Sequence, residues 1–88
     1  MRTIKGYILK SLGSQKLLVG VGANVAHSGV LHKMNESAAY LWKSIEGKDF
    51  DKQMLVDLLL EEYDVSREDA EVAVDDIVNV WLTENVIE

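Results

Sequence analysis

The sequence contains neither cysteine nor proline, and it has no long hydrophobic run. The lack of cysteine excludes disulfides and thiolate metal sites and leaves the redox compartment unconstrained. The lack of proline means that no proline marks a loop, a kink or an edge strand. The longest apolar stretch, residues 17–26, is interrupted by two glycines and an asparagine and is too short to span a bilayer. Because no apolar signal core follows Met1, we expect a cytoplasmic protein without a membrane partner.

Acidic residues are missing from the first part of the chain. Residues 1–35 carry a formal charge of +5, and residues 36–88, with four bases and all fifteen acids, carry −11, which gives the net charge of −6. A charge asymmetry between halves often marks an interaction surface. The same pattern also arises when each half simply solvates its own exposed face.

The 88 residues, 48% of them hydrophobic and 27% charged, have the composition of a soluble globular domain. We therefore expect one domain, residues 1–88, with a modest core and without a large enclosed active site.

Alternating apolar residues and turn residues predict three short strands, at residues 4–12, from 16 to 20 or 21, and at 30–34. Gly13 and Ser14 suit a tight hairpin between the first two strands. Glycine and polar residues between 22 and 29 indicate a loop or an irregular strand end. We expect these strands to form a small antiparallel sheet.

Three helices are predicted to follow, each with a polar residue at its N-cap. Asn35 caps the first helix, which Gly47 ends in a left-handed conformation. Asp51 caps the second helix, which ends near Tyr63, and Ser66 caps the third. The expected core residues are Ala38, Leu41, Trp42, Ile45, Leu55, Leu58, Leu59, Ala70, Ala73, Val74, Ile77 and Trp81, with Val86 and Ile87 tucked back onto the body. Strands followed by helices predict an α+β fold with a winged-helix-like outline.

No catalytic, metal or cofactor site is expected. The two histidines, His27 and His32, have no carboxylate near them in the sequence, and a metal site needs more ligands at fixed spacing. The run Gly20-Val21-Gly22-Ala23 lacks the third glycine and the helix of a dinucleotide-binding loop. Nothing supplies a nucleophile, a base and its orienting group together, so an enzyme is the least expected class.

The second and third helices, joined by Asp64 and Val65, have the outline of a helix-turn-helix. The third helix carries six acids against Arg67 alone. DNA binding depends on basic groups that displace counterions from phosphates. We therefore expect no nucleic-acid partner.

The third strand and the third helix together predict a peptide-binding groove. An edge strand exposes backbone donors and acceptors to which an extended peptide can add. Lys33 on one wall and acids on the other favour a mixed-charge amphipathic peptide and a defined direction. The predicted site residues are Val30, Leu31, His32, Lys33, Met34, Asp69, Val72, Ala73, Asp76 and Val80. Alternatively, Val72 and Val80 are ordinary exposed residues.

Leu60 supports a second interpretation, an adaptor that binds a protein partner through its helical surface. It lies across the second helix from Leu55 and Leu58, with Val56 beside it. Such a pair forms either a docking patch or part of the packing under the sheet.

Several segments, in the order in which they follow along the chain, resemble the PqqD family. The run from Leu31 to Trp42, followed by Glu46-Gly47, resembles the family's strand, Leu-Asn-Glu-Thr-Ala motif, helix, tryptophan and glycine. Ser37 stands where the family usually has threonine, and Met34 where it often has leucine. Residues 58–65 resemble the end of the family's second helix, and residues 75–87 its third helix and closing apolar pair. The resemblance covers nearly the whole chain.

This resemblance implies a precursor-peptide recognition element, a non-catalytic module of winged-helix type. In the family, the leader of a ribosomal precursor adds as a strand to the third strand and lies against the third helix. The module then presents the peptide to a modifying enzyme, in the founding case a radical SAM enzyme with an iron–sulfur cluster, in pyrroloquinoline quinone biosynthesis. Carried over, this places residues 30–34 and the outer face of the third helix at the site.

Overall fold

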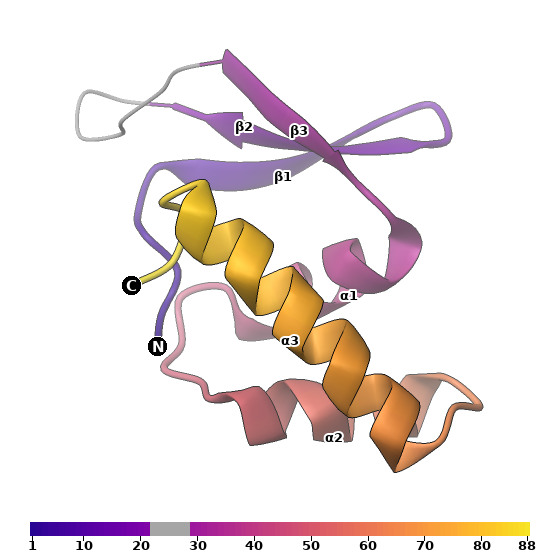
Figure 1. The fold of residues 1–88 in the computed structure, drawn as a ribbon. Helices are drawn as coiled ribbons and strands as arrows, with labels where there is room; N and C mark the ends of the chain where they lie inside the picture. Colours follow the sequence, from indigo (N-terminus) through magenta and orange to yellow (C-terminus); the bar gives the residue numbers. More distant parts are fainter. Residues whose placement is uncertain (22–28) are drawn as a thin grey trace.

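The computed structural model describes the backbone of residues 1–21 and 29–88, and the side chains of these residues except 29–32. The elements follow in the order β1 (Tyr7–Leu12), β2 (Gln15–Gly20), β3 (Gly29–Met34), α1 (Glu36–Ile45), α2 (Lys52–Glu62) and α3 (Arg67–Thr83). The sheet forms one layer, and the helices cover one of its faces (Figure 1). The predicted α+β fold, with three antiparallel strands before three helices, is confirmed.

The sheet is antiparallel with β2 in the middle, so β1 and β3 form its two edges. Gly13, at φ +62°, makes the predicted hairpin turn between β1 and β2. The prediction that the first strand begins at residue 4 is wrong. Gly6 has a φ of +101°, which an extended strand does not allow, so β1 begins only at Tyr7.

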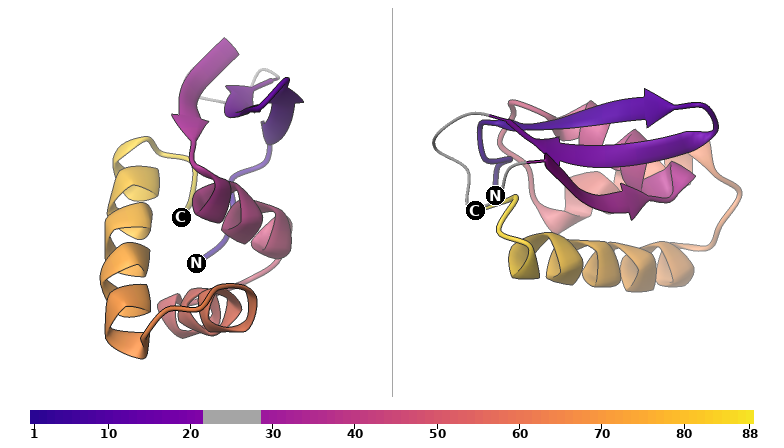
Figure 2. Two further views of the ribbon diagram at one scale, coloured as in Figure 1. Left: turned by 90° about the vertical axis from the view of Figure 1, so that its right-hand side faces the viewer. Right: turned by 90° about the horizontal axis from the view of Figure 1, so that it is seen from above.

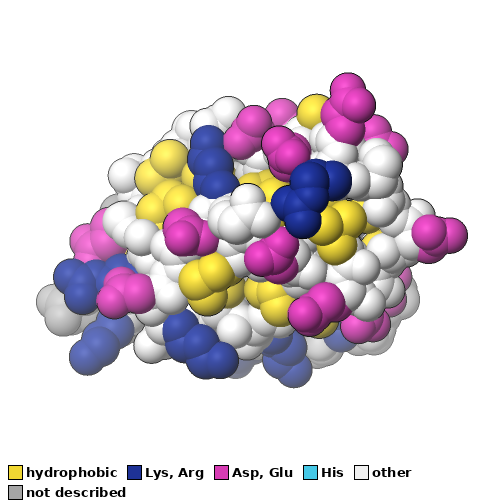
Figure 3. Space-filling model, turned by 90° about the horizontal axis from the view of Figure 1, so that it is seen from below, with side chains coloured by type: hydrophobic (Ala, Val, Ile, Leu, Met, Phe, Trp, Pro, Cys, Tyr) yellow, Lys and Arg dark blue, Asp and Glu magenta, His cyan; other side chains and the backbone are white. Residues whose placement is uncertain are grey.

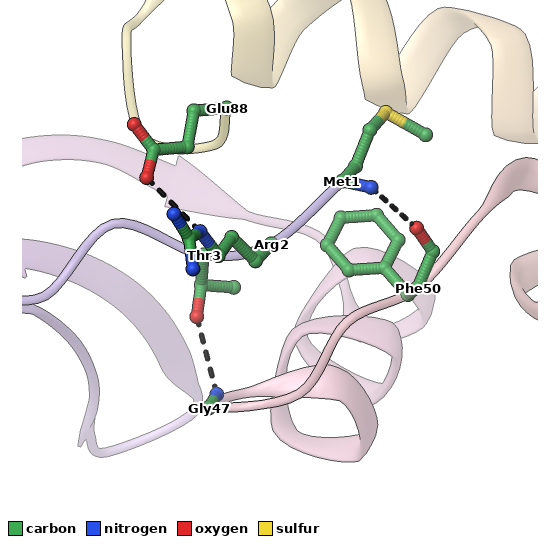
Figure 4. A network of polar contacts seen from close by, with 6 residues as sticks. All are labelled: Met1, Arg2, Thr3, Gly47, Phe50 and Glu88. Carbon is green, nitrogen blue, oxygen red and sulfur yellow. Dashed lines mark hydrogen bonds and ion pairs between the residues drawn. The ribbon is translucent and has the colours of Figure 1, made fainter.

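The residues before this bend pair with distant parts of the chain. The Arg2 amide donates to the Glu88 carbonyl over 2.8 Å, and the Glu88 amide donates back over 2.9 Å. On the other side, the Phe50 amide donates to the Met1 carbonyl over 2.7 Å. Figure 4 shows the Met1 ammonium donating to the Phe50 carbonyl over 2.8 Å and the Gly47 amide donating to the Thr3 hydroxyl over 3.2 Å. These contacts hold both chain ends against the body, and the predicted burial of Val86 and Ile87 is confirmed.

All three predicted N-caps are confirmed by side-chain hydrogen bonds to backbone amides. Asn35 accepts from the Ala38 amide over 2.8 Å, Asp51 from Met54 over 2.9 Å and Ser66 from Asp69 over 3.1 Å. Each bond pairs an amide that the first helical turn would otherwise leave free. Gly47 has a φ of +76° two residues after the end of α1, as predicted.

The core lies between the inner sheet face and the helices. Trp42 of α1 and Trp81 of α3 meet edge to face, with ring centroids 5.2 Å apart and an interplanar angle of 83°. The four predicted core residues of α1 are all buried. Two predicted core residues of α3, Ala73 and Ile77, are only partly buried, and Val78 is buried instead. Leu58 of α2 is also only partly buried.

The difference between the predicted and the observed core residues of α3 has a geometric cause. Its buried residues, Ala70, Val74, Val78 and Trp81, follow the spacing i, i+4, i+8, i+11 and form one stripe toward the core. Ala73 and Ile77 lie on one flank of that stripe. Ile77 lines a hollow together with the last residues of β3, which is the strand nearest to α3 in both views of Figure 2.

Candidate functional site

The outer edge of β3 is the first component of the candidate site. In the described part of the chain, β3 pairs with β2 alone, through Lys16–Met34, Leu17–Lys33 and Leu18–His32. An edge strand of this kind presents a row of backbone donors and acceptors for another strand. Asn35 directly after it caps α1, so the end of β3 is held against the helical layer.

A hollow of about 260 Å³ separates the end of β3 from the second half of α3. It brings together four predicted site residues that lie far apart in the sequence: Lys33, Met34, Asp76 and Val80. Asn35, Ala38, Ile77 and Trp81 complete the lining. Lys33 is exposed and Met34 is buried, so strand alternation places their side chains on opposite faces of the sheet. Lys33 therefore borders the hollow from the strand edge.

A second hollow, of about 390 Å³, continues along α3 toward its N-terminus. It contains the predicted residues Asp69 and Ala73, and its lining is completed by Asn35, Glu36, Ser37, Leu59, Tyr63, Val65 and Ala70. Asn35 lines both hollows. We call the two hollows together the α3 groove.

The acids of the α3 groove differ from other acids of the helices. Asp75 pairs with Lys52 over 3.0 Å, and Asp57 lies 3.7 Å from Arg67. Asp69 and Asp76 are exposed, and among the described residues neither forms an ion pair. Their charges are available to a ligand that lies in the groove.

Tyr63 is the groove residue whose electrostatics are most distinctive. Desolvation raises the pKa of its phenol above the ordinary value of 10.0, and the nearby charges of Glu36 and Glu62 raise it further. Its ring lies edge to face with that of Tyr40, at a centroid distance of 6.1 Å. The phenol is therefore protonated at neutral pH and has a proton to donate.

Sequence reasoning missed several lining residues, of which Tyr63, Leu59 and Asn35 are the clearest. Asn35 was predicted as a cap, and its position directly after an edge strand was the signal for a second role. Tyr63 was predicted only as a helix end, and Leu59 only as a core residue. Nothing local shows that α2 ends beside the first turn of α1.

Other predicted site residues are not brought into the groove by the structure. Val72 is 59% exposed and lies outside the lining of both hollows. Val30, Leu31 and His32 belong to β3 through their backbone pairing, but their side chains are outside the described set, so their roles stay predictions. The structure thus supports a candidate site that consists of one face of α3 and the end of β3.

The adaptor surface around Leu60 receives little support. Val56 is only 3% exposed, and Leu60 is partly buried against the core. On the face seen from below, acidic side chains are spread widely with a few basic ones among them, and hydrophobic side chains show only in separate areas (Figure 3). A docking surface usually needs a contiguous apolar patch.

The described residues offer neither a metal site nor a membrane-spanning helix. No group of three or more His, Cys, Asp and Glu side chains there is placed to hold a metal ion. No helix in this part of the structure is long and apolar enough to cross a membrane.

Two comparisons place the chain among known proteins. Residues 9–87 match the family model described as Coenzyme PQQ synthesis protein D (PqqD), which confirms the resemblance seen in the sequence. The fold is similar to a solved structure, "TbiB1 in Complex with the TbiA(beta) Leader Peptide", with a TM-score of 0.76. The two chains are 17% identical over 100% of this chain and 95% of the other, so the likeness establishes the fold. A search among curated proteins finds no match.

Proposed function

The chain belongs to the PqqD family, and from this premise we propose that it binds the leader segment of a ribosomal precursor peptide without catalysing a reaction. The observation that carries the proposal is the juxtaposition of the open β3 edge with the α3 groove. An extended peptide pairs its backbone with β3 while alternate side chains enter the groove. The similar solved structure, a complex with a leader peptide, supports this mode of binding.

The expected energetics follow from the two kinds of contact. Backbone pairing with β3 supplies affinity that does not depend on the peptide sequence. The groove supplies specificity, because its floor contains the apolar side chains of Leu59, Ala73, Ile77 and Trp81. Burial of one aliphatic side chain of the peptide contributes about 1.5–3 kcal/mol before ordering costs.

A second partner, the enzyme that modifies the precursor, completes the proposed function. We assign a radical SAM enzyme or another peptide-modifying enzyme to this role, in the synthesis of pyrroloquinoline quinone or a related peptide-derived product. The description of the matched family supports the quinone assignment. We place the encounter in the cytoplasm, where a newly made ribosomal peptide and its enzyme are both present.

Amide NMR of the isotope-labelled protein tests the binding site. The probe is a peptide selected on the protein from a random display library. Shifts should concentrate in residues 29–34 and on the groove side of α3, around Ala73 to Val80. Shifts confined to β1 or to the outer side of α2 would contradict the proposed placement.

Backbone methylation of the same peptide tests strand addition. In a paired strand, only alternate residues face the neighbouring backbone with their amide groups. N-methylation at one set of alternate positions should therefore abolish binding, and methylation at the other set should be tolerated. Equal loss from both sets would argue against pairing with β3.

A further inference from the structure

The strand register places two sets of residues on opposite faces of the sheet at the β3 edge. Leu17 is paired with Lys10 on one side and with Lys33 on the other. Its neighbour Leu18 and the β3 residue Met34 belong to the core under the sheet. Because side chains alternate along a strand, Lys10, Leu17 and Lys33 form one row across the outer face.

This outer row is apolar at its centre and positive at both ends. Leu17 is only 6% exposed although it is not part of the core cluster, and both flanking lysines are exposed. Long lysine stems commonly cover apolar surface while the ammonium group stays in water. The three strands contain no acidic residue, so no carboxylate of the sheet neutralises these lysines.

The α3 groove on the other side of the same edge has the opposite charge. Asp69, Ala73, Asp76 and Val80 follow the spacing i, i+4, i+7, i+11 and therefore form one stripe along α3. Glu36 adds a third acid to the groove. Among the described lining residues of the two hollows, Lys33 is the one basic residue, and it lies at the strand edge.

We infer that the peptide bound at β3 alternates in charge: acidic side chains at positions that face outward beside Lys33, and apolar or basic side chains at the alternate positions that face α3. The inference rests on the proposed function and names the class of peptide that it requires. A strand added to β3 continues the alternation of the sheet, so successive residues meet the positive row and the acidic groove in turn. A peptide of uniform charge is repelled on one of its two sides.

The alternation also opposes what net charge alone predicts. The protein carries a net charge of −6, which attracts basic peptides through long-range forces. The proposed peptide has as many acidic as basic positions, or more, because apolar residues occupy part of its α3 side. Binding of such a peptide is thus evidence for local pairing rather than for general attraction.

A display selection with about ten random residues, enough to pair with one strand, tests the inference. Enriched peptides should have acidic residues at one set of alternate positions (odd or even) and apolar or basic residues at the other set. Enrichment without a relation between charge and parity would overturn this inference and leave peptide binding standing. If no peptide is enriched, the proposed function fails and the inference fails with it.

Charge-exchange variants of the protein show which set of alternate peptide positions faces Lys33 and which set faces α3. Lys33→Glu should change the enriched acidic positions to basic ones and leave the other parity unchanged. Asp76→Lys should replace the basic residues at positions on the α3 side with acidic ones and leave the other positions unchanged. Lys43→Glu on α1 and Glu71→Lys on α3 make the same charge changes outside the groove lining and should leave both patterns unchanged.

Two synthetic peptides measure the size of the effect. The first is a peptide from the selection, and the second exchanges each lysine with a neighbouring glutamate, so that composition, net charge and apolar positions stay the same. Each misplaced charge should weaken binding by about 1.5- to 5-fold, the range typical of cross-strand charge pairs. Equal dissociation constants for the two peptides would contradict the inference.

Discussion

The two long sides of α3 both contain apolar residues, but these residues are buried on one side and exposed on the other. On the core side, Ala70, Val74, Val78 and Trp81 are each 1% exposed. On the other side, Val80 is 49% exposed and has Asp76 one turn before it. An apolar residue on the first side stabilises the protein itself, whereas we propose that Val80 contacts the bound peptide. The difference lies in what faces each side: Trp42 on the first and the open edge of β3 on the second.

The largest expected effect is on the core side. Trp81→Ala should lower the free energy of unfolding by about 3–5 kcal/mol, because it removes a buried aromatic ring and leaves a cavity. Thermal and denaturant unfolding measure the change. Val72→Ala on the exposed side is the control and should stay within about 0.5 kcal/mol of the parent. Similar losses for the two variants would show that the two sides of the helix are not distinct.

The next effect separates binding from stability. Val80→Asp should leave the free energy of unfolding within about 0.5 kcal/mol of the parent, since the side chain is half exposed. It should weaken binding of the selected peptide about tenfold or more, equivalent to about 1.4 kcal/mol, because it replaces an apolar side chain of the groove lining with a charge that loses hydration when the peptide binds. Titration calorimetry measures the dissociation constant.

Val72→Asp is the matched control for this change, because Val72 lies on the same helix but outside the groove lining. Its effect on binding should be clearly smaller. An equal loss would extend the contact surface around α3 to Val72, as the sequence alone had predicted.

The helix caps allow a comparison at a smaller scale. Ser66→Ala and Asn35→Ala should each cost about 1 kcal/mol of stability, because each leaves a first-turn amide unpaired. Asn35 also lines both hollows, so its removal should weaken peptide binding, whereas Ser66→Ala should not. Binding that falls equally in both variants would point to general loosening of the fold.

The smallest effect concerns the pH dependence of stability. The pKa of Tyr63 is raised in the folded protein by desolvation and by Glu36, Glu62 and Tyr40. A raised pKa means that the folded state holds the phenol proton more tightly than the unfolded chain does. Its stabilising contribution is therefore complete below pH 10.0 and is lost as pH rises toward the folded-state pKa.

Unfolding measured across this alkaline range, on the parent and on Tyr63→Phe, checks the assignment. The parent should lose more stability than the variant as pH rises. Tyr40→Phe should narrow the difference between parent and Tyr63→Phe, because Tyr40 is one of the groups that raise the pKa of Tyr63. Parallel curves for parent and Tyr63→Phe would contradict the assignment.

Much of the fold was predictable because its signals are local. A cap and its helix lie within four residues, so Asn35, Asp51 and Ser66 could be recognised without tertiary information. The start of β1 was predicted incorrectly because Ile4 fits a strand pattern. The bend at Gly6 and the pairing with Val86, whose carbonyl accepts from the Ile4 amide over 2.9 Å, keep that residue out of the sheet.

The α3 groove was only half predictable for a related reason. Asp76 and Val80 were recognised by their position off the expected core stripe, but Tyr63 and Ile77 were not. The direction of the stripe depends on which helices and strands pack around α3. Ile77 and Val78 are neighbours in the sequence but lie about 100° apart around the helix, so burying one instead of the other turns the core face by part of that angle.

The sequence by itself determined the order of elements, their caps and the separation of charge between strands and helices. These follow from interactions between near neighbours and from composition. Only the tertiary structure decided that α3 turns Asp76 and Val80 toward the end of β3, where they line one hollow together with Lys33. Those relations depend on packing between residues more than forty positions apart, and patterns that span only a few residues do not reveal such contacts.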